Sequence, residues 1–208
     1  MTISIRVSIM KKTSTILDYS QHAKIVCKNQ RRTIVREPFY NPKQIYFAKV
    51  KGNAIIPTRQ SENAGYDFYA TFDEEYILVE PYKTKLIPTG IAWASSEEYY
   101  LQIEERSSTG TKGIKRSCGV IDSGYRGEIK IAIFNANDVP LVFSEYSEED
   151  IRRKHPELGE MLFYSTSKAI AQGIVHRVED VQPREISLEA LLLIPSKRGD
   201  GGWGSSGK

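Results

Sequence analysis

The residue best suited to chemistry in this sequence is Asp122, within residues 119–127 (GVIDSGYRG). A Ser-Gly pair, typical of turns, follows it, and residues 128–134 alternate polar and apolar side chains as a half-buried strand does. A carboxylate on a tight turn before a rigid strand is accessible yet fixed, which suits a general base. The alternative is an Asx turn, in which the Asp122 side chain only caps its own backbone.

Two further stretches have the composition of an anion site. In residues 105–113, Arg106 precedes two serines and nearby glycines, so a guanidinium fork, hydroxyls and main-chain amides can converge on phosphate oxygens. Residues 198–208 are Gly-rich and contain an arginine and two serines, which also favours anions. By composition alone, the first is a polar loop and the second a flexible tail.

The overall composition limits the possible classes of protein. The chain has 208 residues, of which 40% are hydrophobic and 26% charged, so it can bury one sizeable core. A net charge of +3 is too small to indicate nucleic-acid binding, and no apolar run approaches the length of a membrane span. Two distant cysteines give no disulfide framework, which favours a cytoplasmic, intracellular protein. The three histidines lack zinc-ligand spacing, so any metal is expected to arrive with a ligand.

The basic charge is concentrated at the N-terminus. The first 36 residues contain eight Lys and Arg and a single acidic residue, and two prolines then mark a break. We therefore expect residues 1–43 to be a basic extension, either flexible or an edge strand. An organelle-targeting peptide is less favoured, because Ile3, Ile5, Val7 and Ile9 alternate with period two rather than forming a helical face.

Short apolar segments separated by Gly and Pro fill the rest of the chain. This pattern predicts an all-β fold, a sandwich, jelly roll or barrel, over residues 44–197. The expected strands cover residues 45–50, 76–79, 85–89, 90–93, 99–103, 128–134 and 168–175.

One helical segment interrupts the strands. Residues 147–155 begin with the N-cap residue Ser147, carry acids in the first turn and bases in the last, and precede Pro156. We expect a helical insertion of about residues 144–165 on the surface, and a partner-binding element is the alternative.

Five ordered segments together resemble the five motifs of the trimeric dUTPase family. They are residues 64–70 (AGYDFYA), 106–108 (RSS), 119–127, 170–172 (IAQ) and 198–207 (RGDGGWGSSG). The resemblance implies a distorted jelly-roll β-barrel or sandwich and a homotrimer with shared active sites. It also implies Mg²⁺-dependent hydrolysis of dUTP to dUMP and pyrophosphate, which keeps uracil out of DNA and supplies dUMP for dTMP synthesis.

The same resemblance implies a role for individual residues. Asp122 would deprotonate the water that attacks the α-phosphorus, and Asp67 would contact Mg²⁺ through water while the substrate phosphates ligate the ion. The C-terminal arm would close over the site of another subunit. The phosphates would be bound by Arg106, Ser107, Ser108, Gln172, Arg198, Ser205 and Ser206. The base and sugar would be bound by Gly119, Val120, Ile121, Tyr125 and Trp203.

Three positions depart from the family pattern. Trp203 stands where the arm usually has Phe, Thr109-Gly110 replace apolar residues after Ser108, and residues 167–169 (SKA) replace the usual Gly-Asp-Arg. Trp203 is still an aromatic side chain able to stack on a base. The change at residues 167–169 predicts a rebuilt turn next to the insertion.

Two other functions compete with dUTP hydrolysis. A dCTP deaminase shares this fold and phosphate grip, but it needs an acid that activates water at the pyrimidine ring, and Asp122 lies in the hydrolase pattern. A nucleotide-regulated protein-binding module would use the charge-rich insertion or the basic extension.

Overall fold

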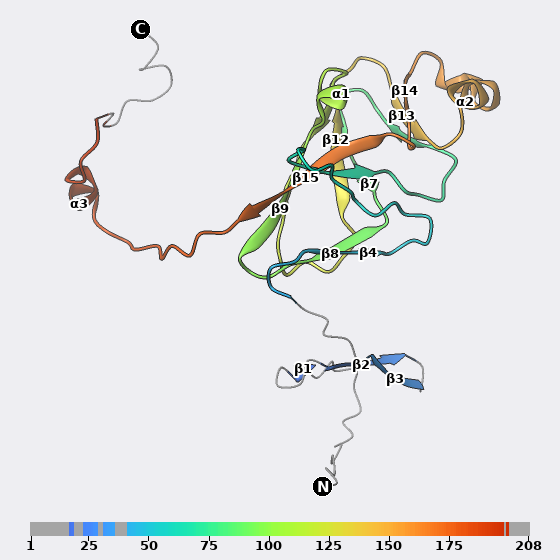
Figure 1. The fold of residues 1–208 in the computed structure, drawn as a ribbon. Coiled ribbons are helices and arrows are strands. Elements are labelled where there is room, and N and C mark those ends of the chain that lie inside the picture. Colours follow the sequence, from blue (N-terminus) through green and yellow to red (C-terminus); the bar gives the residue numbers. More distant parts are fainter. Residues whose placement is uncertain (1–16, 19–22, 29–30, 36–40, 198, 200–208) are drawn as a thin grey trace. The chain divides into compact units, whose positions relative to one another are not determined.

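The computed structural model describes residues 17–18, 23–28, 31–35, 41–197 and 199. The chain divides into two compact units, residues 1–178 and 179–208, each of which is described by itself. Within the basic extension, β1 (Leu17–Asp18), β2 (Ala23–Lys28) and β3 (Arg31–Val35) form an antiparallel sheet in the order β1-β2-β3 (Figure 1). The expected alternating strand at residues 3–9 lies outside the described residues.

Residues 41–178 form a body built from short strands, as expected for an all-β fold (Figure 1). Its largest sheet has the order β11-β9-β15-β5 and consists of β11 (Val120–Ile121), β9 (Tyr99–Glu104), β15 (Ala169–Arg177) and β5 (Tyr66–Tyr69). A second sheet, β10-β12-β7, consists of β10 (Ile114–Arg116), β12 (Lys130–Asn135) and β7 (Thr84–Pro88). All pairings in these two sheets are antiparallel.

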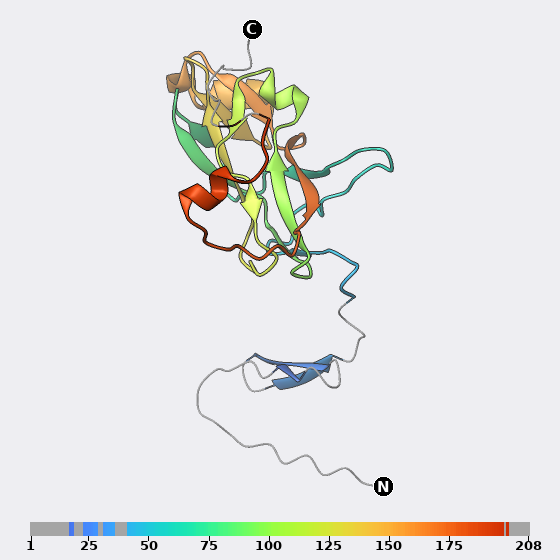
Figure 2. The ribbon, with the colours of Figure 1, turned by 90° about the vertical axis from the view of Figure 1, so that its left-hand side faces the viewer.

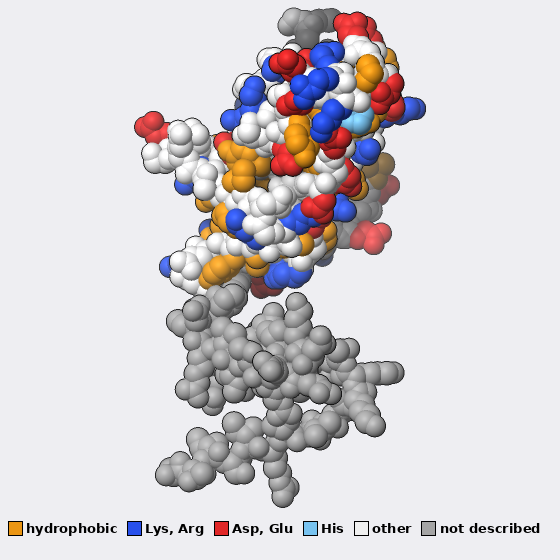
Figure 3. Space-filling view, turned by 90° about the vertical axis from the view of Figure 1, so that its right-hand side faces the viewer, with side chains coloured by type: hydrophobic (Ala, Val, Ile, Leu, Met, Phe, Trp, Pro, Cys, Tyr) orange, Lys and Arg blue, Asp and Glu red, His pale blue; other side chains and the backbone are white. Residues whose placement is uncertain are grey.

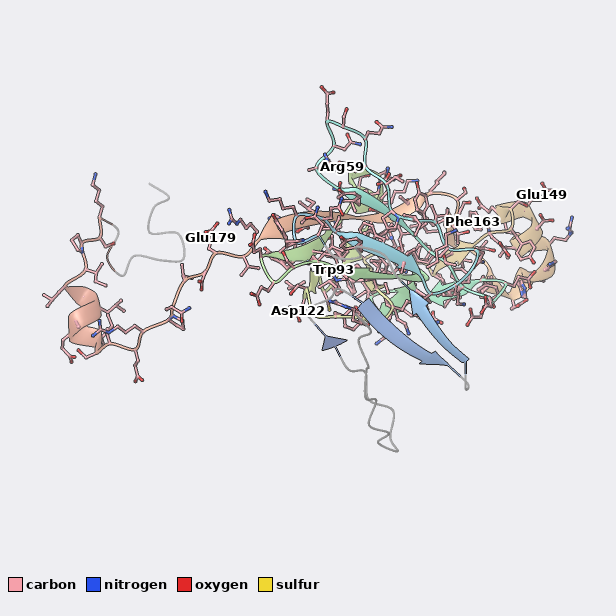
Figure 4. All side chains as sticks on the ribbon, turned by 60° about the horizontal axis from the view of Figure 1, so that its bottom comes forward. Arg59, Trp93, Asp122, Glu149, Phe163 and Glu179 are labelled. Atoms are coloured by element: carbon pink, nitrogen blue, oxygen red, sulfur yellow. The ribbon has the colours of Figure 1, made fainter. Side chains whose placement is uncertain are left out.

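The remaining strands complete the walls of the body. β4 (Tyr46–Lys49) pairs with β8 (Ile91–Ala94) in antiparallel fashion. β6 (Ile77–Val79), β13 (Leu141–Ser144) and β14 (Leu162–Ser165) form a sheet in the order β14-β13-β6. The loop between β4 and β5, which carries Arg59, projects from the body (Figures 2 and 4). Arg59 closes this loop by donating from Nη1 to the Asn63 carbonyl at 2.7 Å.

One hydrophobic core lies between the sheets. Phe68, Trp93, Leu101 and Phe143 are buried at its centre, each supplied by a different strand. The alternating sequence explains this arrangement, because every second side chain of β8 and of the second half of β9 is buried. Gly173 in β15 is required by the packing, since a Cβ there would lie 2.7 Å from the Phe68 ring and 2.9 Å from Leu101.

The insertion is a short crossover between two parallel strands. β13 and β14 pair in parallel, and α2 (Glu148–Lys154) and the 3-10 turn η1 (Pro156–Leu158) connect them. Ser147 caps α2 by accepting a hydrogen bond from the Asp150 amide at 3.1 Å, as the sequence predicted. The helix rests on a small second core of Val142, Ile151 and Met161.

Over its described residues, 179–197 and 199, the second unit contains one short helix, α3 (Leu188–Leu192), capped by Ser187. Its leucines are largely exposed within this unit, as are Val181 and Ile194. Over the described part of the chain, no helix has both the length and the apolar character needed to cross a bilayer.

Candidate active site

Asp122 lies on a tight turn, as the sequence predicted. The turn closes through a hydrogen bond from the Tyr125 amide to the Asp122 carbonyl at 3.1 Å, and the buried indole of Trp93 donates to the same carbonyl at 3.2 Å. Figure 4 shows Asp122 beside Trp93 at the edge of the body. The carboxylate is exposed, and no described residue donates a hydrogen bond to it. It is therefore accessible and does not cap its own backbone.

A cleft of about 450 Å³ opens beside Asp122. The Tyr125 hydroxyl donates to the Glu128 carbonyl at 2.9 Å, and its ring lies so close to Gly127 that a Cβ there would fall 2.5 Å from the hydroxyl oxygen. Gly127 therefore allows Tyr125 to fold back across the turn. The cleft is lined by Leu86, Val120, Ile121, Asp122, Tyr125, Glu128, Ile129 and Lys130.

A second group of polar residues gathers around Arg106. The Arg106 Nε lies 3.0 Å from an Asp67 carboxylate oxygen, and its Nη1 donates to the Ala169 carbonyl at 3.3 Å and to the Ser108 hydroxyl at 3.4 Å. Gln172 faces Asp67 across the β15–β5 pair and donates to the Glu105 carbonyl at 2.9 Å. Three of the sequence motifs, around Asp67, Arg106 and Gln172, thus meet in one place.

The loop after Arg106 contains the short helix α1 (Ser107–Gly110), where the sequence alone indicated only a polar loop. Thr109 is buried and holds the helical turn, since its hydroxyl donates to the Arg106 carbonyl at 2.9 Å and accepts from the Arg106 amide at 3.1 Å. This contact explains the polar residue at a position where the family usually has an apolar one. Ser107 and Ser108 are presented at the surface by the same turn.

Tyr164 lies under the Arg106 group. Its hydroxyl donates to the Ala169 carbonyl at 2.8 Å, and burial raises the pKa of the phenol, partly offset by the positive charge of Arg106. Tyr164 therefore stays neutral and acts as a hydrogen-bond donor. Sequence patterns did not single it out, because its role depends on the pairing of β14 with β13.

Gly119 lies in the segment that joins β10 to β11, next to β9. Its carbonyl accepts from the Ile103 amide at 2.7 Å, and a Cβ at this position would fall 2.6 Å from the Gln102 side-chain nitrogen and 2.7 Å from the Ile103 carbonyl. Only glycine fits this approach without a shift of the chain. Val120 and Ile121 follow in β11, opposite Gln102 and Leu101.

The Asp122 turn and the Arg106 group lie at opposite ends of β9. In the β11–β9 pair, Ile121 faces Leu101, so Asp122 follows beside Tyr100, six residues from Arg106. At about 3.3 Å per residue, the two groups are on the order of 20 Å apart. The two groups of one chain therefore lie far apart along the sheet.

The residues suggested for magnesium form no protein cage. Among the residues that the structure describes, no group of three His, Cys, Asp or Glu side chains is arranged to hold a metal ion. Asp67 supplies a single partly exposed carboxylate next to the phosphate-binding candidates. This arrangement suits an ion that the substrate ligates directly and the protein contacts through water.

The remaining expected ligands, Arg198, Trp203, Ser205 and Ser206, lie outside the described residues.

The chain is similar to known proteins in both sequence and fold. The dUTPase family model matches residues 52–147. The deoxyuridine 5'-triphosphate nucleotidohydrolase of Candida albicans is 32% identical over 167 residues, which cover 79% of this chain and 87% of that protein. The enzyme of the same name from Nautilia profundicola is 34% identical over 164 residues, which cover 77% of this chain and 96% of that protein.

Among solved structures, the dUTPase of Staphylococcus bacteriophage 80alpha with dUpNHpp has a TM-score of 0.60 at 22% identity. The match covers 80% of this chain and 99% of that one, which supports the jelly-roll-like β fold. Because several relatives above 30% identity are covered almost completely, the chain belongs to the dUTPase family.

Proposed function

We propose that Asp122 is the general base in the hydrolysis of dUTP to dUMP and pyrophosphate. The chain is a dUTP diphosphatase by family membership, and the observation that supports this base is the exposed Asp122 carboxylate on a turn anchored by Trp93. Asp122 accepts a proton from water, the water oxygen bonds to the α-phosphorus, and the bond to the bridging oxygen breaks, releasing pyrophosphate. Base catalysis of this kind typically contributes about 10²- to 10⁴-fold.

Arg106, Ser107, Ser108 and Gln172 are proposed to bind the phosphates. Arg106 is already oriented by Asp67 and the Ala169 carbonyl, so its remaining donors can engage phosphate without a large loss of side-chain freedom. Mg²⁺ bound to the substrate would neutralise the triphosphate, and Asp67 is the residue proposed to hold its water shell. In this arrangement Asp67 serves both the metal and the arginine.

The active site is proposed to combine residues of different subunits. The family is trimeric, and the separation of about 20 Å along β9 between the Asp122 turn and the Arg106 group of one chain favours a site that takes them from different chains. The cleft at Asp122, with Val120, Ile121 and Tyr125, would take the base and sugar. Arg198, Trp203, Ser205 and Ser206 of the C-terminal arm are proposed to close over it.

The decisive experiment measures pyrophosphate release from dUTP, dCTP, dTTP and UTP by the wild-type protein and by Asp122→Asn. We expect the wild type to act on dUTP, and Asp122→Asn to retain nucleotide binding with kcat reduced at least a hundredfold. Wild-type turnover in the variant would eliminate Asp122 as the base. The dCTP deaminase alternative is not favoured, and ammonia release from dCTP would be its signature.

A second role, binding of a protein partner through the insertion, has support from the surface of α2. Acidic and basic side chains lie side by side on the face of the molecule that carries this helix (Figure 3). Figure 4 shows Glu149, on this helix, far from Asp122. Because α2 has its own small core, its outer face can change without disturbing the catalytic turn.

The partner proposal is tested by reversing exposed charges, with Glu149→Arg and Arg153→Glu in one protein. These side chains lie outside the Ile151 core, so dUTP turnover should be unchanged while partners that copurify with the native protein are lost. Full retention of those partners would exclude α2 as the docking surface.

A further inference from the structure

An ion pair joins the end of β10 to the end of β9. Arg116, the last residue of β10, places its Nη2 2.7 Å from a carboxylate oxygen of Glu104, the last residue of β9. The main-chain amide of Arg116 also donates to the carboxylate of Glu105 at 3.1 Å. Two consecutive acids therefore hold the side chain and the backbone of the same arginine.

This contact stands at the base of the turn formed by residues 117–119. The Ser117 amide donates to the Ala132 carbonyl at 2.9 Å, and the Gly119 carbonyl accepts from Ile103 at 2.7 Å. Cys118 at the tip is exposed, and among the described residues neither its amide nor its carbonyl has a hydrogen-bond partner. Both flanks of the turn are fixed while its tip keeps a main-chain donor and acceptor available.

The guanidinium also packs against the turn itself. A Cβ on Gly119 would fall 2.9 Å from the Arg116 Nη1, so the arginine lies directly against the Gly119 backbone. Its Nε is buried without a partner in the described part of the chain. Leaving a donor unsatisfied costs stability, and a partly exposed ion pair contributes little in return. A contribution to folding stability therefore does not by itself explain the contact of Arg116 with Glu104 and Gly119.

We infer that Arg116 and Glu104 are positioning residues for recognition of the uracil base. By holding the turn against β9, they set the distance between the Cys118 main-chain groups and the cleft at Val120 and Asp122. An amide and a carbonyl in fixed positions can pair with the complementary edge of uracil and mismatch that of cytosine. The inference rests on the proposed function, because it assigns a role in binding the same substrate.

The test compares Arg116→Met with the wild type. Methionine keeps an unbranched apolar side chain against Gly119 and removes the charge. We expect KM for dUTP to rise about tenfold, the loss of one charge-assisted hydrogen bond partly open to solvent, while kcat stays within about twofold. The preference for dUTP over dCTP should fall by a similar factor. The double variant Glu104→Arg with Arg116→Glu should regain most of the lost affinity.

Arg152→Met is the matched control. It breaks an Arg–Glu pair of the same 2.7 Å length, with Glu148 in α2, and should leave KM and the preference for dUTP unchanged. A KM that is unaffected by Arg116→Met, or affected equally by Arg152→Met, would overturn the inference.

Hydrogen exchange provides a readout that does not need turnover. In the nucleotide-free protein, the amides of Ser117 and Ile103, which donate to the Ala132 and Gly119 carbonyls, should exchange faster in Arg116→Met than in the wild type, and Arg152→Met should not change them. If the wild type failed to hydrolyse dUTP, the proposed function would fail, yet this measurement would still report whether the ion pair holds the turn. Unchanged exchange would refute the positioning role.

Discussion

Mixing two inactive chains tests whether the active site is shared between subunits. One chain carries Asp122→Asn and the other Arg106→Gln, which removes the guanidinium charge but keeps a donor for the Ala169 carbonyl. Each variant alone should be nearly inactive, because every site lacks either the base or the phosphate-binding charge. Assembly from mixed chains should restore activity if the two residues of one site come from different chains.

The size of the recovery follows from the geometry. Asp122 and Arg106 of one chain are on the order of 20 Å apart along β9, and the proposed site takes them from two chains. With equal amounts and random assembly, each residue is intact in about half of the chains that supply it, so about one quarter of the sites should work. If each site were built within one chain, the mixture would contain no working sites.

The assay measures pyrophosphate release per site after the two chains are unfolded together and refolded, or after they are coexpressed with different tags. The control is each variant taken through the same procedure alone. Activity in the mixture no greater than the average of the two single variants would refute the shared site. A recovery near one quarter would exclude a single-chain site and fix which two motifs lie in different subunits.

Three further predictions concern stability and the C-terminal arm. Hydrogen bonds to Glu75 and Glu157 raise the pKa of His155. The stability that these bonds give the folded protein is therefore complete below the ordinary histidine pKa of about 6.5, and it is lost as pH rises through the higher pKa of the folded state. The difference in thermal midpoint between the wild type and His155→Gln should therefore shrink from about pH 6 to about pH 9, and a constant difference would contradict it. Tyr82 has a backbone φ of 57°, in the left-handed region that favours glycine. Urea denaturation should therefore find Tyr82→Gly about 1 kcal/mol more stable than Tyr82→Ala, and equal stability of the two variants would count against backbone strain. Deleting residues 198–208 should lower kcat on the order of tenfold or more with little change in thermal midpoint. Unchanged turnover would show that the C-terminal arm takes no part in the active site.

Local patterns predicted the parts of the fold that depend on neighbouring residues. The seven expected strands appear within a few residues of their predicted positions, because alternation of buried and exposed side chains can be read directly from the sequence, whereas β5, β10, β13 and β14 were not predicted. The cap at Ser147 and the turn at Asp122 were predicted for the same reason, since both depend on a short run of residues. The all-β class followed from the number of such segments.

Features that depend on pairing between distant segments could not be predicted this way. Strand register sets the parallel pairing of β13 with β14. It also places Asp122 beside Tyr100, six residues before Arg106. The Glu104–Arg116 pair joins residues 12 apart in the sequence, on strands of two different sheets, and no motif describes this contact. The α1 helix was missed because its four residues are too few to show helical periodicity.

The attachment of α2 has a consequence for motion. Beyond its small core of Val142, Ile151 and Met161, the C-terminal end of the helix is tied to β6 and the residues before it by two neighbouring side chains. Glu75 contacts both Lys154 and His155, and the Tyr76 ring packs against His155 with the ring centroids 4.9 Å apart. Few contacts of this kind need to break for the helix to lift away while the strands beneath remain paired. The insertion is therefore a candidate for opening as a unit at a small fraction of the free energy of global unfolding, so a bound protein could be gained or released without loosening the catalytic turn.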